Sequence, residues 1–120
     1  GALAIETRSA SEASEAVRAL HHADSGIEAQ AERALVTALG GGCQMPLGAL
    51  ARVRRGRLSL SAFLSEVEGR RWVRDTEEGE TAEPERVARR LAARLLRTGG
   101  ADILRALGLQ PPQLEGLDTE

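Results

Sequence analysis

The stretch from 47 to 64 constrains the fold of this chain more than any other. Apolar residues occupy every second position on both sides of an Arg-Arg-Gly-Arg sequence at 54–57. A period of two is typical of a strand with one buried face, and glycine favours the tight turn that joins two such strands. The sequence therefore predicts a β-hairpin. The residues expected on its buried face are Leu47, Ala49, Ala51, Val53, Leu58, Leu60, Ala62 and Leu64.

Helical patterns flank this hairpin, and a third strand is expected after it. Glu68 and Gly69 indicate a turn before RRWVRD at 70–75, which has strand character. Ser25 and Glu28 have the spacing of a capping box, which indicates the start of a helix. Together these patterns predict an α+β fold: a three-stranded antiparallel sheet with three helices covering one face. The helical segments are expected at 9–23, 24–39 and 84–98, with a short last one at 101–107.

Composition excludes several classes of function. The 120 residues suit one domain, and all sixteen basic residues are arginine, so Schiff-base lysine chemistry and a P-loop lysine are absent. Phe63 and Trp72 are the only aromatic residues and the net charge is −2, which disfavours a nucleic-acid partner. No apolar run approaches the length of a membrane span, so no membrane partner is expected. With a single cysteine, we expect a cytoplasmic, reducing compartment.

That single cysteine, Cys43, directly follows three glycines at 40–42, where a helical pattern ends. A lone cysteine most often fills a buried apolar position, but a filler does not need three preceding glycines. Backbone without side chains instead suits a thiol that must accept a large group. The carboxyl end of a helix opposes a thiolate, which argues against a nucleophile used at every turnover. We therefore infer a residue that is modified once and then serves as a permanent covalent anchor.

The segment ERALVTALGGGCQMPLGALA at 32–51 resembles the cofactor-attachment segment of the porphobilinogen deaminase family, also called hydroxymethylbilane synthases. The resemblance implies that Cys43 holds a dipyrromethane cofactor by a thioether bond. Gly41, Gly42 and Gln44 are the neighbouring residues expected to bind this cofactor. The family activity is that of a transferase, which joins four porphobilinogens into hydroxymethylbilane in tetrapyrrole (heme) biosynthesis.

The same resemblance implies a division of the chain. Residues 1–8 resemble the end of the family's second domain and a hinge, and 9–108 the C-terminal cofactor-attachment domain. Residues 109–120 lie beyond the resemblance, and their composition predicts a flexible tail. The two preceding domains, in the same or a separate chain, are then the expected partners, together with porphobilinogen and linear polypyrroles. Those domains supply the catalytic aspartate, so no catalytic residue is expected here. The chain alone is expected to be inactive.

Other interpretations of the sequence stay open at this point. The chain is alternatively a non-catalytic interaction or regulatory domain that keeps the fold without the chemistry. His21 and His22 are adjacent, so they lack the spacing of a helical metal chelate. A set of arginines around the hairpin either binds carboxylates of pyrrole chains or of an acidic partner, or forms a solvated face. These are Arg52, Arg54, Arg55, Arg57, Arg70, Arg71 and Arg74.

Overall fold

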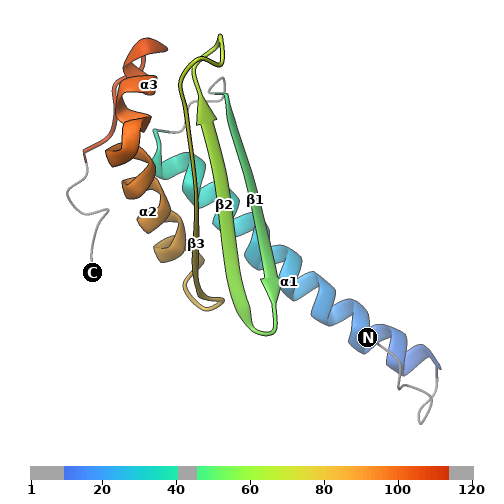
Figure 1. The fold of residues 1–120 in the computed structure, drawn as a ribbon. Helices are drawn as coiled ribbons and strands as arrows, with labels where there is room; N and C mark the ends of the chain where they lie inside the picture. The colour runs from blue at the N-terminus through green and yellow to red at the C-terminus, as the bar shows by residue number, and fades with distance from the viewer. Residues whose placement is uncertain (1–9, 41–45, 114–120) are drawn as a thin grey trace.

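A computed structural model of the chain describes residues 10–40 and 46–113, and Figure 1 shows their arrangement. A long helix precedes three consecutive strands, and a kinked helical stretch follows them. The elements are α1 (Ala10–Ala38), β1 (Leu47–Arg54), β2 (Arg57–Ser65), β3 (Trp72–Glu80), α2 (Pro84–Leu95), η1 (Leu96–Gly100) and α3 (Ala101–Ala106).

The three strands form one antiparallel sheet in the order β1-β2-β3, which confirms the predicted hairpin and third strand. The turn between β1 and β2 places Arg55 at φ 53° and Gly56 at φ 75°. Two positive φ angles in a row are typical of the tight turns whose twist matches that of the flanking strands. Strand β3 extends five residues beyond the predicted segment, because Thr76–Glu80 pairs with β2 despite its acidic composition.

The core lies between the sheet and the helices. Alternate residues of β2 are buried, from Leu58 to Leu64, and they join one hydrophobic cluster with α1, α2 and α3. The opposite side chains of the same strand are half-buried or exposed. Aliphatic residues build this cluster, which fits the scarcity of aromatic residues in the sequence. Its largest fully buried side chains are Leu35, Leu39, Leu58, Leu60, Leu64, Leu91, Leu95, Ile103 and Leu104.

Helix α1 corrects the prediction of two separate helices at 9–23 and 24–39. Ser25 and Gly26 lie inside one continuous 29-residue helix, so the predicted capping box does not begin a new one. Glycine and serine lower helix propensity by at most about 1 kcal/mol each, a cost that packing can offset. From Ile27 onward the helix contacts the core, whereas its first half extends away from the sheet (Figure 1) and leaves Leu20 exposed.

The second helical body runs from Pro84 to Ala106. Pro84 occupies the first turn of α2, as predicted, with Glu85 beside it. Gly99 has a φ of 128° and interrupts the regular helix, but the chain continues through η1 into α3. The described helical segments therefore form two bodies on the sheet, α1 and the kinked stretch α2–η1–α3, where the sequence predicted three helices.

Candidate functional site

The predicted cofactor-binding residues Cys43, Gly41, Gly42 and Gln44 all lie outside the described residues. The structure does describe the residues on either side of them. Gly40 has a φ of 112° and donates its backbone N–H to the carbonyl of Thr37 at 3.1 Å. This left-handed conformation ends α1 in the way expected of a glycine. The last described residue before the segment 41–45 is therefore held against the final turn of α1.

The other side of the segment is attached to the sheet. The carbonyl of Pro46 accepts a hydrogen bond of 3.2 Å from the backbone N–H of Ser65, at the end of β2. Leu47 is then paired with Leu64 in the ladder. Leu39, the residue before Gly40, is 2% exposed and belongs to the core. The described residues on both sides of the segment that contains Cys43 are therefore fixed to the packed domain.

Open space adjoins both of these flanks. A Cβ atom added at Gly40 or at Gly48 would meet no atom within 4 Å, and both glycines are exposed. Among the described residues, the surroundings of the segment can therefore accommodate a bulky group.

The residues around the end of β2 are aromatic and charged. Phe63 and Trp72 stack, with ring centroids 5.7 Å apart and planes inclined by 21°. Arg71 lies 3.3 Å from the carboxylate of Glu66, and Arg70 lies 3.6 Å from that of Glu68. Two of the arginines that the sequence assigned to a binding or solvated face are therefore paired with acidic residues of their own turn.

The hairpin arginines are arranged differently. Arg52 and Arg54 of β1 and Arg57 of β2 line one hollow of about 340 Å³ with Leu58, Ser59 and Glu78. Arg54 lies directly opposite Arg57 in the ladder. Like charges in directly opposed positions destabilise a strand pair, so this arrangement costs free energy in the isolated domain.

An ion-pair cluster between α2 and β3 was not predicted from the sequence. The guanidinium of Arg94 lies 3.0 Å from Asp75, contacts Glu77 and donates to the backbone carbonyl of Thr76 at 2.6 Å. Arg90 also approaches Glu77, at 3.6 Å. The hydrogen bond from Arg94 lowers the pKa of Asp75 below its ordinary value, and the two carboxylates raise the pKa of Arg94. This cluster joins α2 to the sheet.

Two further carboxylates join α1 to the other edge of the sheet. Glu32 accepts a hydrogen bond from the backbone N–H of Ala51, and Glu28 accepts one from that of Val53, each at 2.9 Å. Glu28 and Glu32 are four residues apart and so lie on one face of the helix. The sequence pattern had assigned Glu28 to a capping box. The i, i+4 spacing is the signal that could have indicated a shared role.

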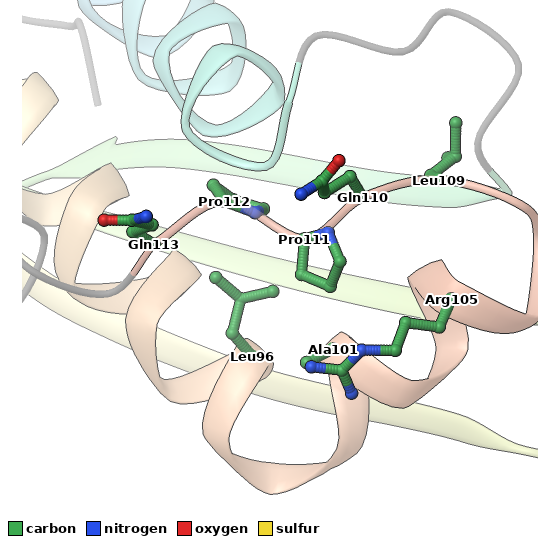
Figure 2. A pocket seen from close by; sticks show the side chains of 8 residues that line it. All are labelled: Leu96, Ala101, Arg105, Leu109, Gln110, Pro111, Pro112 and Gln113. Carbon is green, nitrogen blue, oxygen red and sulfur yellow. The ribbon is translucent and has the colours of Figure 1, made fainter.

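A separate hollow lies beside η1 and α3. Residues 109–113 line it together with Leu96, Ala101 and Arg105, and its volume is about 520 Å³. In Figure 2, Leu96 points toward the segment that carries Pro111 and Pro112. Residues 114–120 lie outside the described part, so the proposed division at residue 109 stays a prediction.

The described residues show no sign of a metal site or a membrane span. His21 and His22 lie within α1, and no group of three or more His, Cys, Asp or Glu in residues 10–40 and 46–113 could hold a metal ion. None of the helices in those residues combines the length and apolar character that crossing a bilayer requires.

Comparison with known proteins identifies the family. The family model of the porphobilinogen deaminase C-terminal domain matches residues 27–97, a range that includes Cys43. The porphobilinogen deaminase of Desulforudis audaxviator is 45% identical over 105 residues, which are 87% of this chain and 34% of that protein. The enzyme of Moorella thermoacetica is 37% identical over 117 residues, or 97% of this chain and 37% of that protein. The enzyme of Trichlorobacter lovleyi is 42% identical over 105 residues, with 87% and 34% covered.

These relatives agree with the resemblance found in the sequence. The chain spans about a third of the length of the curated relatives that it matches. The sheet and the end of α1, which flank Cys43, lie within the matched range. The chain belongs to the porphobilinogen deaminase C-terminal domain family.

Proposed function

We propose that this chain is the C-terminal part of a hydroxymethylbilane synthase and that Cys43 carries a dipyrromethane cofactor through a thioether bond. The observation that carries the proposal is the family match over residues 27–97, a range that contains the lone cysteine. Because the chain covers about a third of its relatives, the activity would require the remaining domains, in this or another polypeptide. The isolated chain is then expected to be inactive.

The described surroundings of the segment 41–45 fit such a tethered group. Gly40 and Gly48 border open space, and the backbone hydrogen bond from Ser65 to Pro46 fixes the start of β1. When bound, a dipyrromethane supplies the pyrrole carbon to which substrate units are added. The domain would hold one end of the growing chain in place, which turns each addition into a reaction between tethered partners.

The position of Cys43 after the end of α1 supports a permanent bond over a recycling thiolate. The carboxyl end of a helix carries partial negative charge and disfavours a thiolate, whereas a neutral thioether is not opposed in this way. Gly41, Gly42 and Gln44 are the residues that we propose to contact the cofactor. We also propose a cytoplasmic location, consistent with the single cysteine.

The proposal is tested by reassembly. The chain is joined to the two N-terminal domains of a relative, and formation of hydroxymethylbilane from porphobilinogen is measured. Cys43→Ser should abolish turnover, because a hydroxyl cannot form the thioether. Glu15→Ala, on the exposed first half of α1, is the control, and it should retain activity. Full activity of Cys43→Ser would instead support the alternative of a non-catalytic interaction domain.

A further inference from the structure

The face of the sheet opposite the core carries both aromatic residues of the chain. Phe63 is 40% exposed and Trp72 is 57% exposed, and they stack on each other. Leu50, on the same face, is 52% exposed. In a chain with one Phe, one Trp and no Tyr, the core contains no aromatic ring at all. An exposed group of large apolar side chains of this kind indicates a binding surface.

This surface, which we call the open face, is also basic. Arg74 lies directly opposite Phe63 in the β2–β3 ladder. Further along the strands, the hairpin arginines Arg52, Arg54 and Arg57 lie on the same face. Among the described residues, none of these four guanidinium groups forms a salt bridge, in contrast to the arginines of the α2–β3 cluster.

Two acidic residues share the open face with these four arginines. Glu78 borders the hollow lined by the hairpin arginines, and Glu80 lies opposite Arg57 in the ladder. Two carboxylates against four guanidinium groups leave the face with a net positive charge. An anionic ligand would therefore be attracted to it.

We propose that the open face binds an aromatic polycarboxylate, with rings packed on Phe63 and Trp72 and carboxylates paired with Arg74 and the hairpin arginines. One end of the face carries the stacked rings of Phe63 and Trp72, and the other end carries the hairpin arginines. Aromatic rings stack on exposed aromatic side chains, and guanidinium groups bind carboxylates through two parallel hydrogen bonds. The ligand would also relieve the repulsion between Arg54 and Arg57.

The dimensions favour a ligand of several carboxylated rings over a single small acid. Phe63 lies six positions after Arg57 in β2, which corresponds to about 20 Å along a strand. A linear chain of several carboxylated pyrrole rings has this length and chemistry. This identification rests on the proposed function. At the aromatic end of the face, Trp72 is paired with Ser65 in the ladder. The backbone N–H of Ser65 donates a hydrogen bond to Pro46, the first described residue after the segment that contains Cys43.

A second copy of the chain fits the open face less well than an anionic ligand does. A stable interface buries about 800 Å² on each partner, with an apolar centre. The open face offers three exposed large apolar side chains beside a net positive charge, and the same charge on a facing copy would repel it. The charge pattern therefore favours an anionic ligand.

Trp72 makes the proposal directly measurable, because it is the single tryptophan. The full chain carrying Cys43→Ser is titrated with uroporphyrin, a stable tetrapyrrole with eight carboxylates, and tryptophan fluorescence is followed with correction for absorbed light. We expect saturable quenching that weakens as salt rises, because exposed ion pairs are screened. The Cys43→Ser background removes covalent attachment. A lack of binding in this test would therefore contradict the open-face proposal and leave the proposed function intact. An unmodified Cys43 would likewise contradict the proposed function and leave binding at the open face intact.

Charge-removing variants locate the site. Arg74→Gln should raise the Kd by about two- to fivefold, the size expected from one exposed ion pair. The triple change Arg52→Gln, Arg54→Gln and Arg57→Gln should raise it by about tenfold or more, because it removes three such pairs. Arg89→Gln is the matched control for Arg74→Gln, because Arg89 is exposed on α2 and its loss changes the charge by the same single unit. Its Kd should stay unchanged.

Three results would overturn the proposal. The first is equal quenching by a tetrapyrrole of similar size that carries positive charges. The second is an equal loss of affinity in Arg89→Gln. The third is a concentration-dependent increase in mass that Trp72→Ala abolishes, which would assign the face to contact between copies of the chain.

Discussion

The carboxylate of Glu32 on α1 accepts a hydrogen bond of 2.9 Å from the backbone N–H of Ala51 in β1. Strand β1 is an edge of the sheet, and the outward-facing N–H groups of an edge strand are free to pair with another chain. Glu28 satisfies the N–H of Val53 in the same way. These two carboxylates therefore join the long helix to the sheet and also protect the edge strand that follows Cys43.

Removing one of these acceptors should destabilise the domain. Glu32→Ala leaves a part-buried N–H without its partner, and we expect a loss of about 1 to 2 kcal/mol in the free energy of unfolding, measured by urea denaturation. Glu32→Gln keeps an oxygen acceptor and should lose less. Glu15→Ala, on the exposed first half of α1, is the control. Equal stability of Glu32→Ala and Glu15→Ala would contradict the assigned role.

The ion pair between Asp75 and Arg94 predicts an acid-sensitive contribution to stability. Arg94 lowers the pKa of Asp75 in the folded state below the ordinary value of 3.8. At pH values between the folded pKa of Asp75 and 3.8, this carboxyl binds more protons in the unfolded state than in the folded state. The contribution of the ion pair to the free energy of unfolding is therefore fully present above 3.8 and is lost as the pH falls through the folded pKa. Unfolding by urea at a series of acidic pH values should show this loss. Asp75→Asn should reduce the slope in that range, and an unchanged slope would exclude the pair as its source.

Gly79 on β3 tests the packing of α2 against the sheet. A Cβ atom at this position would lie 2.5 Å from Cγ2 of Val87, a β-branched residue in the core. Overpacking of this kind typically costs about 1 to 3 kcal/mol, and we expect Gly79→Ala to lower the melting temperature accordingly. Gly48→Ala meets no neighbour within 4 Å and should change stability little. A larger effect at Gly48 than at Gly79 would contradict this close packing of α2 against β3.

Gly26 distinguishes the continuous helix from the two predicted ones. It lies in the middle of α1 with open space around it, so alanine should raise helicity and contribute about 0.5 to 1 kcal/mol to local helix stability. Circular dichroism and amide exchange of residues 14–26 would detect the gain. If residues 24–26 joined two helices instead, Gly26→Ala would leave the exchange of the first half unchanged.

The sequence predicted the sheet better than the helix boundaries, for physical reasons. Alternation around Arg54–Arg57 identified the hairpin, because a half-buried strand requires a period of two. The end of β3 carries Thr76–Glu80, whose polar residues contain no such signal and form a strand only by pairing with β2. The signal at Ser25 was equally local. It could not show that the core contacts from Ile27 onward keep the helix continuous.

The candidate site could be predicted only in part. The glycines and Cys43 are marked by composition and by resemblance to the family, and their segment lies outside the described residues. The ion-pair cluster of Arg94 and the carboxylates of Glu28 and Glu32 depend on contacts between residues 17 to 25 positions apart. Such contacts follow from the fold and leave no local pattern in the sequence. The open face required the strand register before its aromatic and basic residues could be placed together.

The proposed function depends on a dipyrromethane that Cys43 carries through a thioether. The chain is produced together with its N-terminal domains in cells that make porphobilinogen, and the peptide containing Cys43 is analysed by tandem mass spectrometry. We predict an added mass equal to two linked pyrrole units on the sulfur, absent from Cys43→Ser. An unmodified Cys43 thiol in a fully active enzyme would contradict the proposed function.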